Sequence, residues 1–135
     1  LNIMAQHMVE DWIGYEVLPC SMYGIRTYTE GAVIPPYVDQ YPFVLTAVLN
    51  VHQAIKEEWP LEILGHDGTE YNVSMKSGDM VLYEGHSVRH GRPYPFQGHH
   101  FANVYFHFVP VSASNENNIV SPTSEQADLA KLYNW

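Results

Sequence analysis

The sequence predicts one mainly β domain, an antiparallel sandwich or barrel with short helices at the N- and C-terminal ends. About seven or eight short runs of apolar, β-branched and aromatic residues are separated by turns rich in Gly, Pro and Asp. The 135 residues are 46% hydrophobic and only 16% charged, which suits a single core and excludes a disordered chain. Because no repeat or linker divides residues 1–135, we expect one domain.

The two ends of the chain have helical patterns. In residues 1–20, apolar side chains recur at helical spacing until Gly14, which predicts a helical N-terminal support. Residues 111–135 form a tail rich in Ser and Asn, within which residues 124–132 are predicted to form a short helix docked by Trp135.

Between these ends, strands are predicted from alternation and from turn residues. Residues 101–109 (FANVYFHFV) alternate throughout, and residues 44–51 (VLTAVLNV) form an apolar run of strand length. The other predicted strands are shorter, and they cover residues 23–28, 35–38, 61–64, 71–75, 80–83 and the strand-to-turn element 90–93.

The charge balance restricts the partners. Six Lys and Arg stand against 15 Asp and Glu, so clustered cations for nucleic acid are missing. The single cysteine, Cys20, excludes an intrachain disulfide and a Cys-rich zinc site. No apolar run approaches the ~18–20 residues of a membrane span, and no charged-then-apolar leader opens the chain. We therefore expect no nucleic acid and no membrane as partners, and favour a soluble, cytoplasmic protein.

Histidine is frequent in this sequence: the eight His outnumber the six Lys and Arg together. Imidazole is a common metal ligand, so this frequency suggests a metal site. His90 is the most suggestive, since it opens the rigid element HGRP just before the last long strand. His86 lies four residues earlier in a stretch that does not look helical. His107 alternates with large apolar neighbours, and the pattern leaves open whether it faces the inside or the outside of the barrel.

The remaining histidines have plainer interpretations. His7 suits a helix surface, His52 a polar strand end, and His66 a solvated turn. Of His99 and His100, at most one faces inward, because neighbouring residues of a strand point to opposite faces.

Asp39 is the candidate carboxylate partner for His90. Tyr37 and Asp39 lie two residues apart, so on an extended strand both side chains project to the same face. Asp39 also precedes a turn that contains Pro42, where it would serve as a turn cap. Taken alone, the residue leaves both roles open.

These residues form an ordered pattern along the chain: Arg26-Thr27-Tyr28, Gly31, Pro36-Tyr37-Val38-Asp39, Gly78-Asp79, His90-Gly91-Arg92-Pro93 and Gly98. Over residues 23–108, this order resembles the iron(II)/2-oxoglutarate-dependent oxygenases of the prolyl 4-hydroxylase type. In that family a His-x-Asp motif is followed by a distal His, then by Gly at +8 and a basic residue at +10. Here His90 follows Asp39 by 51 positions, with Gly98 at +8 and His100 at +10.

The resemblance implies a double-stranded β-helix (a cupin-like jelly roll) with iron near its open mouth. Asp39 and His90 would bind Fe(II), and three adjacent positions of the ion would stay open for 2-oxoglutarate and O₂. The prime substrate would be a small molecule or a peptide, with ascorbate as an optional reductant.

The resemblance also implies residues that bind 2-oxoglutarate. Tyr28 matches the family tyrosine that donates a hydrogen bond to this co-substrate. His100 occupies the basic position, but a neutral imidazole attracts a carboxylate less than a permanent cation does. Arg92 and Arg26 are therefore the alternative anchors of the far carboxylate.

Tyr37 departs from the family pattern, because it occupies the first position of His-x-Asp. A phenol is a poor ligand for Fe(II), since its pKa near 10 must fall before it donates as phenolate. Three arrangements remain open: Tyr37 is a weak ligand, His86 supplies the lost imidazole, or Asp39 and His90 alone hold the ion.

Three functions follow from the sequence. The first is a 2-oxoglutarate-dependent dioxygenase that hydroxylates a C–H bond and converts 2-oxoglutarate to succinate. The alternative is a catalytically impaired jelly-roll binding module that has lost one metal ligand. The third is a metal-independent interaction domain, for which ten Tyr are compatible but weak support, because aromatic side chains in β domains mostly pack in the core.

Overall fold

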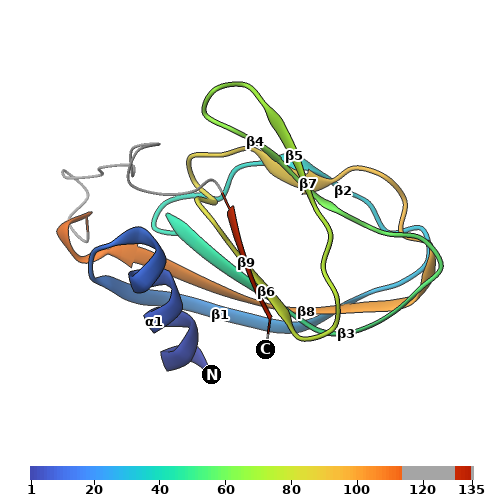
Figure 1. The fold of residues 1–135 in the computed structure, drawn as a ribbon, viewed down its shortest axis with the longest axis horizontal. Helices are drawn as coiled ribbons and strands as arrows, with labels where there is room; N and C mark the ends of the chain where they lie inside the picture. The colour runs from blue at the N-terminus through green and yellow to red at the C-terminus, as the bar shows by residue number, and fades with distance from the viewer. Residues whose placement is uncertain (114–129, 135) are drawn as a thin grey trace.

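The computed structural model describes residues 1–113 and 130–134. One helix, α1 (Asn2–Ile13), precedes two antiparallel sheets that face each other (Figure 1). The other elements are β1 (Val17–Tyr28), β2 (Ile34–Tyr37), β3 (Leu45–Ile55), β4 (Leu61–Leu64), β5 (Glu70–Val73), β6 (Asp79–Tyr83), β7 (His90–Arg92), β8 (Gly98–Pro110), the 3₁₀ helix η1 (Val111–Ala113) and β9 (Ala130–Asn134).

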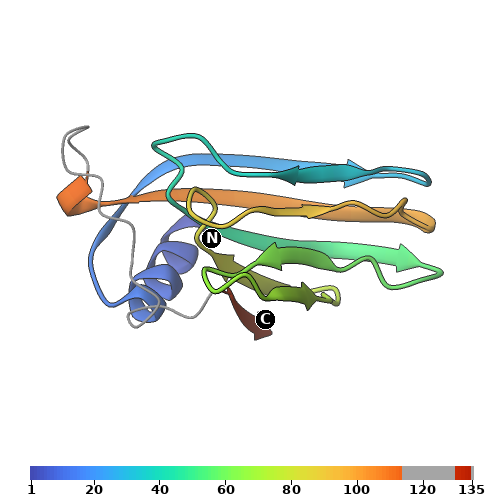
Figure 2. The same cartoon turned by 90° about the horizontal axis from the view of Figure 1, so that it is seen from above.

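The larger sheet has the strand order β1-β8-β3-β6-β9, and the smaller sheet has the order β2-β7-β4-β5. The chain passes from one sheet to the other at most connections. As a result, β2 lies over β1 and β7 lies over β8 (Figure 2). This is the arrangement of a jelly roll, so the predicted fold class is confirmed. It also brings the segment after β2 and the start of β7 to the same end of the barrel.

The larger sheet is covered on both faces. On β8, Phe106 and Phe108 belong to the core beneath α1, whereas Phe101 packs in the core between the two sheets. On β3, Leu45 likewise faces α1 and Val48 faces the smaller sheet. Because both faces are buried, the two strands have apolar residues on both sides, and alternation alone does not identify the inner face.

Helix α1 ends at Ile13, next to Gly14, where the helical spacing in the sequence also ends. Its buried residues recur at helical spacing, and they are Ala5, Val9, Trp12 and Ile13. Gly14 adopts the left-handed conformation (φ 88°), and its N–H donates to the Glu10 carbonyl at 2.9 Å, which closes the helix. The predicted end of the helical spacing at Gly14 is therefore confirmed, whereas residues 17–20 of the predicted helical support belong to β1.

The C-terminal prediction is corrected in part. Most of the helix predicted over residues 124–132, and Trp135, lie outside the described residues. Residues 130–132, however, belong to β9, which pairs antiparallel with β6 from Tyr83↔Ala130 to Asp79↔Asn134. Pairing satisfies backbone groups that β6 would otherwise expose at the sheet edge, and this gain outweighs a weak local preference for helix. In the described part of the tail, the helical element is η1.

No helix in residues 1–113 and 130–134 is long and apolar enough to cross a lipid bilayer.

Candidate metal centre and cavity

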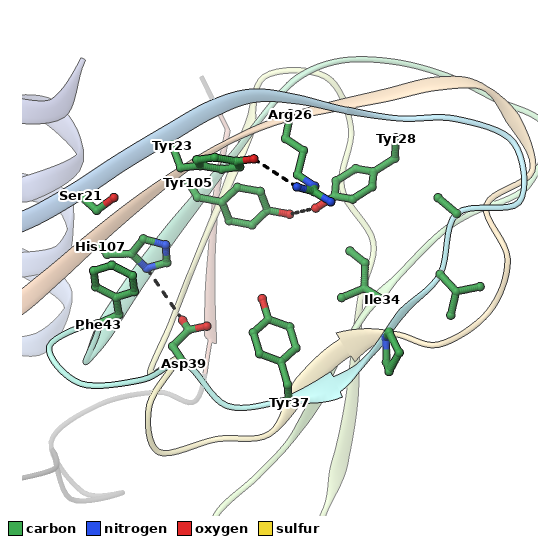
Figure 3. Close-up of a pocket in the computed structure, with 13 residues that line it drawn as sticks. Ser21, Tyr23, Arg26, Tyr28, Ile34, Tyr37, Asp39, Phe43, Tyr105 and His107 are labelled. Atoms are coloured by element: carbon green, nitrogen blue, oxygen red, sulfur yellow. Dashed lines mark hydrogen bonds and ion pairs between the residues drawn. The ribbon is translucent and has the colours of Figure 1, made fainter.

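A cavity of about 520 Å³ opens between β1 and β8 on one side and β2 with its following segment on the other (Figure 3). Its wall is largely aromatic, from Tyr23, Tyr28, Tyr37, Phe43 and Tyr105. Asp39 and His107 add the ionisable groups at one end, and Arg26 adds a cation at the other. Of the residues predicted from the sequence, Tyr28, Tyr37 and Asp39 thus line one cavity.

The structure brings Asp39 and His90 together. Tyr37 of β2 pairs with His90 of β7, and Asp39 follows two residues after Tyr37. Both side chains are buried, with Asp39 7% and His90 2% exposed. The distance from His90 Nε2 to Asp39 Oδ1 is 3.5 Å. Two residues that are distant in sequence are therefore neighbours because their strands are neighbours.

Hydrogen bonding fixes the tautomer of His90. Its Nδ1 lies 2.9 Å from the Val88 carbonyl, which only accepts, so Nδ1 carries the hydrogen in the neutral ring. The lone pair is then at Nε2, which is buried and has no hydrogen-bond partner within the described chain. Metal-binding histidines commonly have this arrangement, with one nitrogen donating to a carbonyl and the other free to coordinate.

Asp39 is held from three sides. The Thr46 hydroxyl donates to its Oδ2 at 2.9 Å, and its own N–H donates to the Gly85 carbonyl at 2.8 Å. The His86 ring donates from Nδ1 to the Asp39 carbonyl at 2.7 Å. His86 therefore braces the backbone of Asp39. A Cβ at position 85 would overlap Asp39 Oδ2, so the carboxylate sits where only glycine leaves room.

The Asp39 carboxyl group is ionised at neutral pH. Burial raises its pKa, but the interaction with the neighbouring His90 imidazole and the hydrogen bond from the Thr46 hydroxyl lower it by more. The net pKa lies below the ordinary value. A carboxylate that is already ionised is the form that binds a metal cation.

His107, whose direction the sequence left open, turns into the cavity (Figure 3). Its Nδ1 lies 3.2 Å from Thr46 Oγ1 and 3.8 Å from Asp39 Oδ2. Because the Thr46 hydroxyl hydrogen is directed to Asp39, His107 Nδ1 is the donor to Thr46, and the lone pair is at Nε2. The ring stacks on Phe43 at 4.3 Å, and burial lowers its pKa, which favours the neutral imidazole.

Tyr37 remains a neutral phenol. Its hydroxyl points into the cavity (Figure 3), and its ring lies 4.6 Å from the His90 ring. Burial, and then the negative charge of Asp39, raise the pKa of Tyr37 to about 12. The sequence argument that a phenol is a poor ligand is therefore strengthened by the local electrostatics.

Two arginines lie near the cavity in different surroundings. Arg26 is exposed, donates to the Tyr23 hydroxyl at 3.2 Å and stacks over the Tyr28 ring at 5.2 Å. The Tyr28 hydroxyl in turn bonds that of Tyr105 at 2.7 Å. Arg92 does not line the cavity but is buried behind it, with 1% exposure.

Arg92 is a buried cation without a carboxylate partner among the described residues. Its guanidinium lies 5.1 Å from the Trp59 ring and 5.0 Å from the Phe101 ring. One terminal nitrogen contacts Met75 Sδ at 3.5 Å, and Nε has no partner. Cation–π contacts offset part of the desolvation cost, but an unpaired buried charge remains unfavourable for the fold alone.

His100 does not join this cavity. It lies on the other face of the larger sheet, in contact with His52 and His99. The position that the family resemblance assigned to the 2-oxoglutarate anchor is therefore distant from Asp39 in this fold. His100 has the same parity along β8 as Phe106 and Phe108, which face α1, and a bulge between Asn50 and His52 in β3 places His52 opposite Ala102 on that same face.

His66 lies in an exposed turn, as predicted, and its Nε2 lies 3.0 Å from Glu84 Oε2, with 29% of its side chain exposed. Glu84 is fully buried, and its Oε1 has no partner in the described residues. Burial raises the pKa of Glu84 above its ordinary value of 4.5, although His66 opposes this.

The raised pKa gives a pH prediction. The folded state holds the Glu84 proton more tightly than the unfolded state, so stability is lost as pH rises from the unfolded pKa through the folded one. We expect Glu84→Gln to match the wild type at about pH 4 and to become the more stable form at about pH 7. Urea unfolding at both values measures this, and a Gln variant that loses relative stability as pH rises would contradict it.

The donor set fits a divalent cation at two positions, Asp39 Oδ1 and His90 Nε2. The main support is His90 Nε2, which is buried beside an ionised oxygen of Asp39 and has no hydrogen-bond partner within the described residues. In the described residues, no group of three His, Cys, Asp or Glu side chains is arranged to hold a metal. His107 contributes an imidazole to the cavity but not, as placed, a third ligand.

Comparison with solved structures agrees with this fold. A crystal structure of a Pseudomonas putida prolyl-4-hydroxylase superposes with a TM-score of 0.54 and 21% sequence identity, over 64% of this chain and 50% of that chain. The present chain thus spans about half the length of that neighbour. No family model and no curated protein sequence matches the present chain. At this identity the likeness concerns the fold, and the chain has a jelly roll like that of a prolyl-4-hydroxylase.

Proposed function

We propose that this protein is an iron(II)/2-oxoglutarate-dependent dioxygenase acting on a small molecule or a peptide. One observation carries the proposal: the free lone pair of His90 Nε2 is buried 3.5 Å from the ionised Asp39 beside an aromatic cavity. The fold supports it, because jelly rolls of this kind place such a pair at the open mouth of the barrel.

In this proposal, Asp39 and His90 hold Fe(II). The bound ion would supply the activation of O₂, coupled to conversion of 2-oxoglutarate to succinate and CO₂, for hydroxylation of a C–H bond. The chain's own residues prepare the site. Thr46 orients the carboxylate, the Val88 carbonyl fixes the His90 tautomer, and the neutral Tyr37 presents a hydroxyl to the cavity.

The co-substrate is a dicarboxylate, so its far end needs a cation. Arg92 is our choice, because it is buried behind the cavity without a counter-ion, and its guanidinium packs on the same aromatic cluster as Tyr28. Arg26 at the cavity mouth is the alternative anchor. Tyr28 would donate a hydrogen bond to the co-substrate, and ascorbate remains an optional reductant.

Succinate release tests the enzyme. With Fe(II), 2-oxoglutarate and O₂, we expect slow conversion to succinate even without the prime substrate, and we expect His90→Ala and Asp39→Ala each to abolish it. His7→Ala, in an exposed position of α1, is the matched control and should change nothing. Turnover that survives both site substitutions would refute the proposal.

Tyr37→His should strengthen the site. An imidazole at position 37 would add a third neutral ligand beside Asp39 and His90, and we expect the affinity for Fe(II) to rise by more than about tenfold. Anaerobic Fe(II) titration measures this, with Tyr37→Phe as a control that removes the hydroxyl without adding a ligand. Equal affinities for all three forms would show that position 37 does not face the ion.

The second candidate is a binding module that has lost a metal ligand. The neutral phenol of Tyr37 and the two-donor site favour it. A binding module would bind 2-oxoglutarate, or another dicarboxylate, with the same affinity in the presence and in the absence of Fe(II). The oxygenase would bind 2-oxoglutarate much more tightly when the metal is present. Calorimetric titration in the two conditions separates these candidates.

A further inference from the structure

Three histidines form a connected chain on the surface, away from the cavity. His52 of β3 and His100 of β8 are diagonal neighbours, because His52 pairs with Ala102 and Ala54 pairs with His100. Their rings stack at 4.9 Å with an interplanar angle of 18°. His52 Nδ1 lies 2.7 Å from His100 Nε2, and His100 Nδ1 lies 2.8 Å from His99 Nδ1.

The protons in this chain can be assigned as a set. A neutral imidazole has one N–H and one lone pair, so His100 donates from one nitrogen and accepts at the other. When His100 donates from Nδ1 to His99, its Nε2 lone pair faces His52 Nδ1. In the metal-free protein, His52 Nδ1 therefore donates to His100 Nε2. Because His52 is exposed, its hydrogen can move to Nε2, in water, when a cation binds, and both facing nitrogens then offer lone pairs.

We propose that His52 Nδ1 and His100 Nε2 chelate a divalent transition metal such as Zn²⁺, Ni²⁺ or Cu²⁺ on the outer face of the larger sheet. Tetrahedral ligands at ~2.0–2.1 Å from Zn²⁺ lie about 3.3 Å apart. The distance between His52 Nδ1 and His100 Nε2 therefore needs to increase only slightly from 2.7 Å. Two exposed side chains allow this movement, and water completes the shell.

His99 acts as a positioning residue for this site. By accepting from His100 Nδ1, it fixes the tautomer in which Nε2 coordinates, as an outer-shell acceptor does for metal-binding histidines. The formal charge of −9 favours cations near the surface. Imidazole donors select these metals over Mg²⁺ and Ca²⁺, which prefer oxygen. The site does not depend on the proposed oxygenase activity, since it shares no residue with Asp39 and His90.

Calorimetric titration with Ni²⁺ tests the site in the full chain. We expect His52→Gln and His100→Gln each to weaken this binding by about tenfold or more, because a chelate becomes a single-histidine contact. His7→Gln, which removes another exposed histidine, is the matched control and should leave the affinity unchanged. Melting temperatures without metal confirm that the variants fold.

Two further variants sharpen the test. His90→Ala should retain the Ni²⁺ site on the surface, whatever it does to iron. His99→Ala should weaken binding, and His99→Gln should largely restore it, because the Gln side-chain oxygen also accepts a hydrogen bond. Ni²⁺ binding that is unchanged in His52→Gln, or that disappears only in His90→Ala, would overturn the proposal.

Discussion

Arg92→Met is expected to leave the protein folded while abolishing tight binding of 2-oxoglutarate. The guanidinium is buried without an ion-pair partner in the described chain, so replacing it with an apolar side chain of similar length removes a desolvation cost. Loss of two cation–π contacts opposes this gain. We expect the free energy of unfolding to stay equal or rise by about 1 kcal/mol, and the affinity for 2-oxoglutarate to fall more than about tenfold.

Urea unfolding and calorimetric titration in the presence of Fe(II) measure the two effects separately. Arg26→Met is the matched control, because that arginine is exposed and should change stability little. If Arg26→Met instead abolishes co-substrate binding and Arg92→Met does not, the anchor is at the cavity mouth. A loss of more than about 2 kcal/mol in Arg92→Met with binding intact would assign Arg92 a purely structural role.

Gly85→Ala is expected to disrupt the metal pair through Asp39. An added Cβ would overlap Asp39 Oδ2 and lie 2.6 Å from Thr46 Oγ1, so the carboxylate must move away from His90. Overpacking of this kind costs about 1–3 kcal/mol of stability. We also expect Fe(II) affinity to fall by about tenfold or more, because a ligand displaced by about 1 Å no longer meets the ion.

Gly14→Ala provides the comparison for this variant. A Cβ at Gly14 meets nothing within 4 Å, but the left-handed φ of 88° strains any other residue there. The Gly14→Ala variant should therefore lose stability like Gly85→Ala, but its affinity for Fe(II) should be unchanged. Equal Fe(II) affinities for Gly85→Ala and the wild type would show that the position of Asp39 is not critical for the site.

The sequence predicted most strands because their signals are local. The strand 61–64 agrees with β4 residue for residue, and the long alternation of residues 101–109 lies within β8. The end of α1 near Gly14 was predicted, whereas the strand β9 was missed. Gly14 terminates the helix through a backbone conformation, whereas β9 forms because β6 offers an unpaired edge, which is a tertiary effect.

The candidate site was predictable only in part. The proximity of Asp39 and His90 followed from a family resemblance, since neither residue indicates the other by local pattern. The inward direction of His107 was not predictable, because β8 is covered on both faces and alternation is symmetric between them. His100 alternates in step with Phe106 and Phe108 along β8, so it lies on the outer face with them, but the sequence alone does not show which face of β8 is the outer one.

Anaerobic equilibrium dialysis of Fe(II) tests the central claim most directly. The parent protein carries His52→Gln, which removes the surface chelate, and it is compared with the same protein carrying Asp39→Asn in addition. Asparagine keeps the size of the side chain but removes its negative charge. We expect the parent protein to bind one equivalent of Fe(II), and to bind it more tightly when 2-oxoglutarate is present. The affinity of Asp39→Asn for Fe(II) should be lower by about tenfold or more. Equal Fe(II) binding by the two forms, or binding that 2-oxoglutarate does not strengthen, would contradict an oxygenase centre at Asp39 and His90.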